Sequence, residues 1–289
     1  MNHKLARFAI ACTALSGTAG GCERPTPVAL MESPAQTQAP HGPVNSAATV
    51  HVNVRPSLHG EPFSCVEREG ASMRPTELML FVHDLEWVLA NNTRVPVALL
   101  PDGIWQTERL ALLDFAGTQN GCVDASSAIN ETLIFQGDAP AEVAFLSFRL
   151  GVPFELNHAD PTTHSGPLTQ MQMHWGWRGG YKFLRLEGVN GEHDVLLHLG
   201  STGCVGPMTA VERCERPGQM EILVPWSPGM AIGLELAPLL DAALLLGHRC
   251  MGSDGSGMTN CSTAWDALSA DAGPDAVWFA IAPSPVGHP

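Results

Sequence analysis

Five histidines lie within or beside apolar segments of the chain, where imidazole is an unusual side chain. His83 and His198 each stand inside an apolar run, His158 follows a Val-Pro turn, His51 opens the first apolar segment, and His174 precedes a tryptophan. Neutral imidazole is a common ligand of copper and zinc, and burial keeps it neutral. We therefore take these five as candidate metal ligands, although each alone also suits a hydrogen-bonded structural histidine.

Two other kinds of side chain near these histidines could take part in a metal site. Asp84 adjoins one histidine and Asp160 lies close to another, so either carboxylate could orient a ring, or could simply be an exposed turn residue. Met171 and Met173 offer thioether sulfur, which suits Cu(I). The same two methionines are also consistent with an ordinary core strand.

The signatures of the common enzyme classes are missing from the sequence. It contains no Gly-x-Ser-x-Gly elbow, P-loop, His-Glu-x-x-His or dinucleotide fingerprint, and no Cys-x-x-Cys-His for haem attachment. We therefore expect a binding protein, with no catalytic residues. A copper-dependent redox enzyme is the alternative, and it would need an open coordination position.

Short segments of alternating apolar residues must position these side chains. The clearest covers 77–89, where every second residue from Met79 to Leu89 is apolar or histidine. The 29 Gly and 23 Pro favour frequent turns over long helices. We predict an all-β fold, an antiparallel β-sandwich or barrel-like single domain with disulfides and few short helices (239–247 and 262–270). The predicted strands are 50–58, 77–89, 143–150, 168–177, 181–187, 194–199, 220–224 and 230–236.

Charge and composition narrow the class of partner. The chain carries a net charge of −14, and no Lys/Arg cluster appears. Nucleic acids are bound through a concentrated basic footprint, so we expect no nucleic acid partner. The hydrophobic fraction of 45% is sufficient for a large core, and we expect a monomer.

The N-terminal segment is typical of an exported protein. A short basic region at Lys4 and Arg7 precedes a small, apolar stretch, so residues 1–21 are interpreted as a signal peptide. Residues 22–48 form a Pro/Ala-rich tether, and 49–289 the β domain. Cys22 follows Ala-Gly-Gly and is a candidate lipidation site, with ordinary cleavage as the alternative. The expected location is the periplasm or cell surface, with Cys22 as an outer-membrane anchor where it is lipidated.

Six cysteines follow Cys22, and an even number in an exported protein favours disulfides. A thiolate metal site is the alternative, although no Cys-x-x-Cys occurs. Proximity in sequence alone suggests two of the pairs. The predicted pairs are Cys65–Cys122, Cys204–Cys214 and Cys250–Cys261.

Several stretches together resemble the MbnP-like copper-binding family, the four-Cys motif proteins of the "metallo-mystery pair". They occur in order between about residues 60 and 215, and Cys250 and Cys261 resemble the family's C-terminal part. The matching stretches are LFVHDL (80–85), ALLDF (111–115), GVPFELNH (151–158), MHWGW (173–177), GYKFL (180–184) and HLGSTGC (198–204).

The resemblance implies a β-rich protein that binds copper through histidines. His83, His158 and His198 match the family's recurrent histidines, and Trp175 and Trp177 match its tryptophan pair. In the family one tryptophan is oxidised to kynurenine by a di-haem cytochrome c peroxidase-like maturation protein, which is therefore the implied partner. His174 stands where an aromatic residue is expected, so it is either an additional ligand or a tolerated substitution. The alternative function is a metal-free, disulfide-stapled lipoprotein that acts as a binding or scaffold module.

Overall fold

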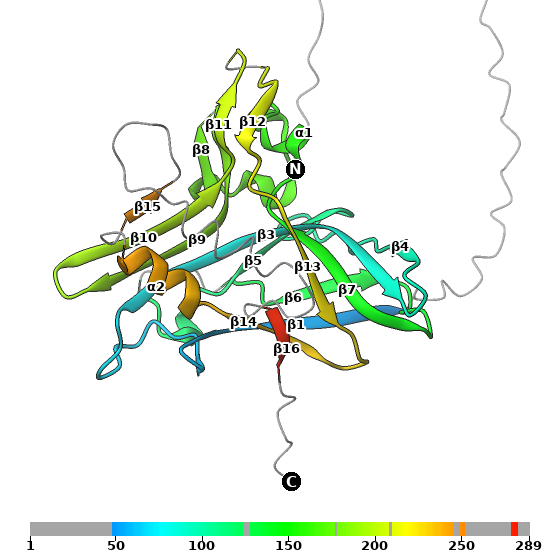
Figure 1. The fold of residues 1–289 in the computed structure, drawn as a ribbon, viewed down its shortest axis with the longest axis horizontal. Helices are drawn as coiled ribbons and strands as arrows, with labels where there is room; N and C mark the ends of the chain where they lie inside the picture. Colours follow the sequence, from blue (N-terminus) through cyan, green and yellow to red (C-terminus); the bar gives the residue numbers. More distant parts are fainter. Residues whose placement is uncertain are drawn as a thin grey trace, which may run out of the picture. The chain divides into compact units, whose positions relative to one another are not determined.

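The fold of the chain is all-β, as predicted. A computed structural model describes residues 48–123, 128–176, 178–207, 210–245, 249–251 and 279–282. Its strands form two larger sheets and a separate two-stranded hairpin, and its helices are short (Figure 1). None of the helices within these ranges combines the length and the apolar character that a membrane crossing requires.

The smaller sheet has five strands in the order β16-β14-β1-β2, with β6 also paired to β1. The β1–β14 pair is parallel and the others are antiparallel. This sheet therefore departs from the purely antiparallel pairing that the sequence suggested. Its strands are β1 (Thr49–Leu58), β2 (Glu61–Pro62), β6 (Thr132–Gln136), β14 (Ala231–Glu235) and β16 (Phe279–Ala282).

The larger sheet has nine strands and carries most of the candidate residues. Its main path is β13-β7-β3-β9-β10-β15, and β4, β5 and β8 pair with its members. Only β10 and β15 run parallel within it. Its strands are β3 (Arg74–Leu89), β4 (Arg94–Pro96), β5 (Leu110–Asp114), β7 (Val143–Leu150), β8 (His174–Gly176), β9 (Gly180–Asn190), β10 (His193–Gly200), β13 (Met220–Pro225) and β15 (Arg249–Met251).

The remaining elements connect or cover the sheets. The hairpin pairs β11 (Thr202–Val205) with β12 (Arg213–Arg216). The α-helices are α1 (Phe154–Asn157) and α2 (Ala237–Leu245), and α2 overlaps the helix predicted at 239–247. The 3₁₀ helices are η1 (Thr118–Asn120), η2 (Pro161–Thr163), η3 (Gly166–Thr169) and η4 (Met171–Met173).

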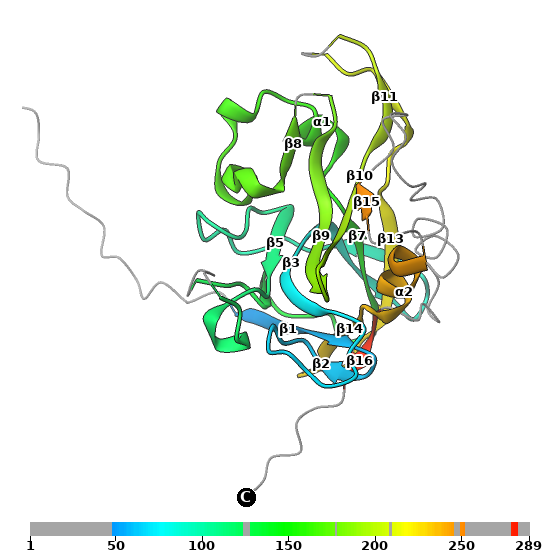
Figure 2. The same ribbon diagram turned by 90° about the vertical axis from the view of Figure 1, so that its left-hand side faces the viewer.

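The core lies between the two sheets. Trp87 of β3 packs edge-on against Phe135 of β6, with ring centroids 5.3 Å apart. Both rings are buried, in one cluster with aliphatic residues of both sheets. Because every second residue of a strand faces the same side, alternating apolar positions in β1, β3 and β7 bring these side chains into a common interior. Figures 1 and 2 show the smaller sheet on one side of this core and α1 and β8 at the far side.

The larger sheet divides into two branches at the middle of β3. Met79 pairs with Asp114 of β5 on one edge and with Arg185 of β9 on the other. Further along, His83 again pairs with β5 on the first edge, but with Arg149 of β7 on the second. Strands β7 and β9 therefore leave the same edge of β3 in succession and diverge. We call this point the fork.

Gly151 closes the fork and has to be glycine. Its amide donates to the carbonyl of Phe81, at 2.9 Å. Its φ is +122°, and a Cβ atom there would lie 2.8 Å from Cδ2 of Phe183. A larger residue would therefore meet both backbone strain and the Phe183 ring.

Residues 151–179, which join β7 to β9, form the segment we call the fork connection. It contains α1, three 3₁₀ helices and the short strand β8. The predicted strand at 168–177 is wrong for most of its length, because η3 and η4 occupy its first half. Gly166 has a φ of +60° and Pro167 lacks an N–H, so the backbone turns here instead of extending. The spacing of Met171 and Met173 therefore arises from a 3₁₀ turn.

The other predicted strands are confirmed, with ends shifted by a few residues. The disulfides Cys65–Cys122 and Cys204–Cys214 are confirmed. Cys250 is also disulfide-bonded, but Cys261 lies outside the described residues, and its pairing stays a prediction. Cys22, the boundary at 21 and the helix predicted at 262–270 also lie outside them, and the boundary at 48 stays a prediction.

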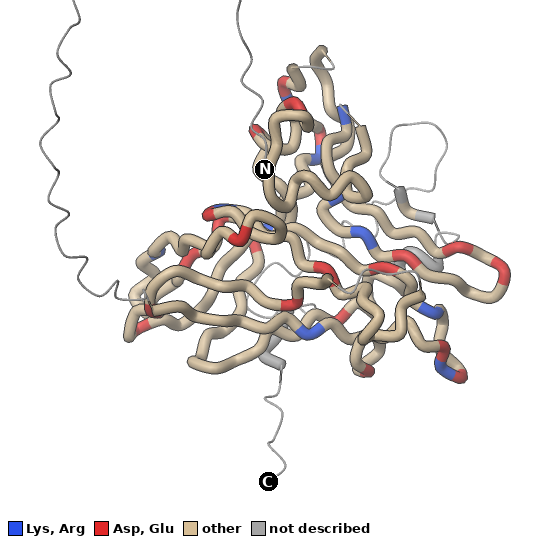
Figure 3. Tube along the Cα trace, turned by 180° about the vertical axis from the view of Figure 1, so that it is seen from behind, with Lys and Arg blue, Asp and Glu red and all other residues tan. Residues whose placement is uncertain are grey.

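Charged residues are distributed over the described part of the chain without a continuous stripe of one sign (Figure 3). They act instead in local clusters. Two arginines each bridge a pair of glutamates on the larger sheet. Arg185 contacts Glu77 and Glu187, whereas Arg94 contacts Glu86 and Glu221.

Candidate metal centre

The five predicted histidines lie in different surroundings. His51 is exposed on β1 of the smaller sheet, and its Nε2 lies 3.3 Å from the hydroxyl of Thr49. Across the described ranges, one group of three or more His, Cys, Asp or Glu residues has all its ligand atoms within 4.8 Å of one another. It contains one of the five histidines, together with two cysteines. In this part of the chain, the ring nitrogens of three or more of the predicted histidines do not come within 4.8 Å of one another.

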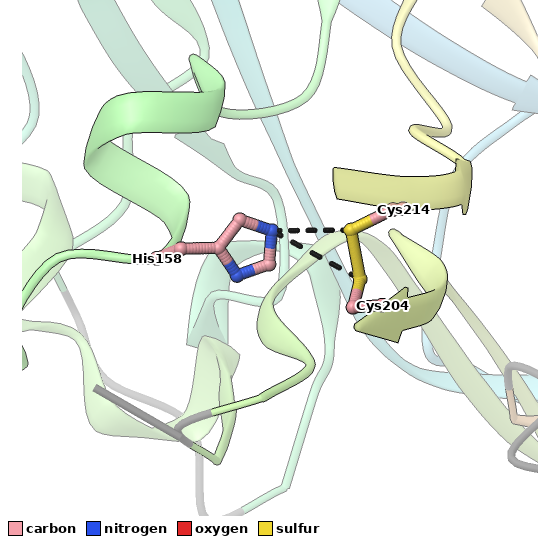
Figure 4. A group of neighbouring side chains, drawn as sticks. All are labelled: His158, Cys204 and Cys214. Atoms are coloured by element: carbon pink, nitrogen blue, oxygen red, sulfur yellow. Dashed lines mark hydrogen bonds between the residues drawn. A yellow bond between two sulfur atoms is a disulfide. The ribbon is translucent and has the colours of Figure 1, made fainter. Parts of the chain in front are cut away.

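The group consists of His158, Cys204 and Cys214 (Figure 4). His158 Nε2 lies 3.4 Å from Sγ of Cys214 and 4.0 Å from Sγ of Cys204. The two sulfurs are joined in a disulfide. A disulfide sulfur lacks the thiolate charge that metals bind, so these three residues do not form a metal site in the oxidised protein.

Hydrogen bonding explains the present position of His158. The backbone N–H of Tyr181 donates to Asn157 Oδ1 at 2.7 Å, which fixes the orientation of the amide. The amide nitrogen of Asn157 then donates to His158 Nε2 at 3.1 Å. His158 Nε2 is therefore the acceptor nitrogen of a neutral ring, and burial lowers the pKa of this histidine. The contacts hold α1 against the beginning of β9.

Two other histidines, His164 and His174, contact Tyr181, the only tyrosine of the chain. The hydroxyl of Tyr181 donates to the carbonyl of Leu168 at 2.8 Å. The hydroxyl has one proton, so it must accept from Nδ1 of His164, which lies 2.9 Å away. His164 therefore carries its proton on Nδ1 and presents a bare lone pair at Nε2. That Nε2 is buried and has no hydrogen-bond partner among the described residues.

His174 packs against the same tyrosine. Its ring centroid lies 5.0 Å from that of Tyr181, whereas the ring of His164 stacks at 5.8 Å. Burial lowers the pKa of both histidines, and the proximity of His164 lowers the pKa of His174 further. Both rings are therefore neutral at pH 7, which is the form that coordinates metals. His174 is partly exposed, so an ion can approach this pair from solvent.

His198 belongs to β10 and has a different partner. Its Nε2 lies 2.6 Å from a carboxylate oxygen of Glu187, so this nitrogen donates, and the buried Nδ1 has no partner among the described residues. Burial lowers the pKa of His198 despite the carboxylate. Its ring centroid lies 6.3 Å from that of Trp175. His198 is therefore an imidazole oriented by a carboxylate and lying beside a candidate tryptophan.

Glu187 belongs to a part-buried charge cluster on the larger sheet. Arg185 contacts Glu187 at 2.7 Å and Glu77 at 3.1 Å. Burial alone would raise the pKa of Glu187, but hydrogen bonds from His198 and Arg185 lower it to about 2. For Glu77, burial raises the pKa by more than Arg185 lowers it. The nearby carboxylates of Asp114 and Glu187 act in the same direction as burial, so the pKa of Glu77 is about 7. Two neighbouring carboxyls thus have strongly separated pKa values.

We expect Glu77 to make the protein less stable as the pH rises. Its pKa is about 7 in the folded state against an ordinary value of 4.5, so the folded state holds more protons between these values. The free energy of unfolding therefore falls as the pH rises through this window. Between about pH 5 and about pH 8 the unsubstituted protein should lose on the order of 2 kcal/mol of its free energy of unfolding, measured by urea unfolding. Glu77→Gln resembles the protonated side chain, so this variant should not show the loss. Equal losses in both proteins would contradict this assignment.

His83 is buried on β3 at the fork. Its Nδ1 lies 3.0 Å from a carboxylate oxygen of Asp84, but neither ring nitrogen makes a well-aligned hydrogen bond within the described part of the chain. Arg109 holds the same carboxylate in two hydrogen bonds. Burial lowers the pKa of His83, which favours a neutral ring. His83 stays a candidate ligand, with the carboxylate of Asp84 beside its ring.

His164 and Trp177 are the two candidates for which sequence and structure do not overlap. His164 was missed by the sequence analysis, because it lies in a Pro/Thr-rich turn with neither strand nor helix periodicity. Its only signal was its residue type. Trp177 lies outside the described residues, so its predicted role stays a prediction.

Comparisons with known proteins agree with this fold. The sequence model of the MbnP family matches residues 47–244. Among solved structures, MbnP from Methylosinus trichosporium matches with a TM-score of 0.61 and 22% sequence identity, covering 80% of this chain and 92% of that one. No curated protein sequence matches this chain.

Proposed function

Because the chain belongs to the MbnP family, we propose that it binds copper, with His164 and His174 as ligands. The observation that carries this proposal is the bare, buried Nε2 of His164, which Tyr181 fixes in the ligand-ready tautomer. An unpartnered buried polar atom is costly, and a bound cation would satisfy it. Imidazole nitrogen suits copper well.

The donor groups present fit the metal. The two imidazoles are neutral, and the Nδ1 proton of His164 has the partner that an outer-shell contact normally supplies in metal sites. A third ligand could come from a tryptophan of the fork connection once it is oxidised. Kynurenine offers an aniline nitrogen and a ketone, whereas indole offers no good ligand. Trp175 is half-buried beside His198, and Trp177 is the second candidate.

We further propose that a di-haem cytochrome c peroxidase-like protein makes this modification, and that the protein stores or delivers copper without catalysing a reaction. Bound copper would supply a one-electron redox centre. The N-terminal segment supports export to the periplasm or the cell surface, with Cys22 as a lipid-anchor site.

The decisive experiment is the mass of peptides and the copper content of protein purified from its native host. Oxidation of one tryptophan to kynurenine adds about 4 Da, because one carbon is lost and one oxygen gained. We expect this gain on the peptide that carries Trp175 and Trp177, together with bound copper. An unmodified peptide with copper would leave a plain histidine site. Absence of copper, and no change in the unfolding temperature when copper is added, would favour the metal-free scaffold.

A further inference from the structure

We infer that Cys204, Cys214 and His158 form a second site, for the soft cation Cu(I), which opens when their disulfide is reduced. His158 Nε2 already faces both sulfurs, at 3.4 and 4.0 Å (Figure 4). The three ligand atoms lie within 4.8 Å of one another. Two thiolates and one imidazole are a donor set that suits Cu(I). The inference does not rest on the proposed function, because it uses neither His164 nor His174.

The disulfide between Cys204 and Cys214 is less buried than the one between Cys65 and Cys122. Cys204 and Cys214 face each other across the β11–β12 hairpin, which belongs to neither large sheet. Both cysteines are of intermediate exposure. By contrast, Cys65 and Cys122 are 2% and 4% exposed and form part of the core. Reduction under native conditions should therefore open the hairpin disulfide first.

Contacts other than the S–S bond hold the three groups together. Thr202 pairs with Arg216 and Val205 with Arg213, so the backbone of the hairpin brings both cysteines to opposite positions. This pairing does not require the sulfur–sulfur bond.

The imidazole of His158 is also held near the hairpin by contacts that do not involve the sulfur–sulfur bond. The amide nitrogen of Asn157 lies 3.3 Å from the hydroxyl of Ser201, and that hydroxyl donates to the carbonyl of Pro217 at 2.8 Å. These two bonds join α1 to Ser201, just before β11, and through it to Pro217, just after β12. His158 therefore stays beside the cysteines after reduction, and its Nε2 can exchange the hydrogen bond from Asn157 for a metal.

The chemistry balances with a dithiol as the reductant. The dithiol gives two electrons and two protons to the Cys204–Cys214 bond, which becomes two thiols, while the dithiol becomes a disulfide. Binding of Cu(I) then releases the two thiol protons and changes no oxidation state.

The test uses the mature protein carrying His164→Ala and His174→Ala, so that the first site is silent. The protein is reduced anaerobically with a phosphine, freed of reductant, and titrated with Cu(I) against a chromogenic chelator. We expect one equivalent of Cu(I) more than in the oxidised protein. Adding Cys204→Ser and Cys214→Ser should remove this equivalent, whereas Cys65→Ser and Cys122→Ser should keep it.

His158→Gln tests the imidazole, since two thiols alone also bind Cu(I). We expect the affinity for Cu(I) to fall at least about tenfold, because replacing even a group that only orients a metal ligand costs at least this much. An unchanged affinity would overturn the three-ligand site. The inference is also overturned if reduction adds no Cu(I), or if the extra equivalent survives Cys204→Ser and Cys214→Ser. These outcomes leave the proposed site at Tyr181 unaffected, because its ligands are absent from every variant.

Discussion

Replacement of both His164 and His174 by alanine should abolish stoichiometric copper binding while leaving the fold intact. Both rings pack on Tyr181 near the surface of the fork connection, and neither belongs to the hydrophobic core. Loss of two nitrogen ligands removes the donors that the proposed site depends on. Copper bound per protein, measured after dialysis of the oxidised protein, reports the result, and circular dichroism checks the fold.

Two further variants sharpen this experiment. His51→Ala removes an exposed histidine of the other sheet, and copper binding should not change. Tyr181→Phe removes the hydroxyl that holds the proton on Nδ1 of His164, so the ring can present the wrong tautomer. The affinity of the Tyr181→Phe variant for copper should fall about 10- to 100-fold, as it does when other groups that hydrogen-bond a metal-ligating histidine are replaced. Full copper binding by the double alanine variant would refute the assignment of His164 and His174 and point to His198 or His83.

Replacement of Arg185 by methionine should destabilise the protein by about 3 kcal/mol, the lower end of the range for breaking a buried ion pair. Its guanidinium compensates Glu77 and Glu187, and the side chains of all three residues are at most 20% exposed. Without it, the Glu187 carboxylate loses its guanidinium partner in a low-dielectric region, whereas Glu77, whose pKa is already about 7, becomes protonated. Urea unfolding of the disulfide-bonded protein measures the loss.

Arg94→Met is the matched control for this prediction. Arg94 also bridges two glutamates, Glu86 and Glu221, but its side chain is 41% exposed. Water screens such a cluster, so the expected loss is below about 1 kcal/mol. If both variants lose the same free energy of unfolding, burial does not govern the strength of the two clusters.

The two-sheet frame could be predicted from the sequence because strand periodicity records which face is buried. Alternating apolar residues in β3, β7 and β9 gave strands within a few residues of those observed. The fork connection could not be predicted in this way. Its Met-x-Met spacing imitates a strand, but Gly166 and Pro167 turn the backbone into 3₁₀ helices.

The candidate site was predictable only in part, for a related reason. Residue type identified His174 and His198, but their surroundings depend on which strands pair. His164 and Tyr181 are 17 residues apart and meet through a turn that has no periodic signal. The tautomer of His164 depends on a single hydroxyl proton, which no sequence pattern records. The contact of His158 with the hairpin cysteines likewise arises from tertiary packing alone.

The fork has a consequence for how this protein can change. Strands β7 and β9 hold their places by pairing with β3 after and before Phe81 along the same edge, and residues 151–179 bridge the gap between them while burying Val152, Leu168 and Met173 in the core. Apart from β8, the described residues of that bridge supply no strand to the sheet, so the positions outside its buried side chains can vary while the frame persists. The architecture thus separates a frame of paired strands from a connecting segment whose exposed part can be exchanged. Transplanting another bridge between Gly151 and Gly180 is a route to new ligand sets on the same frame.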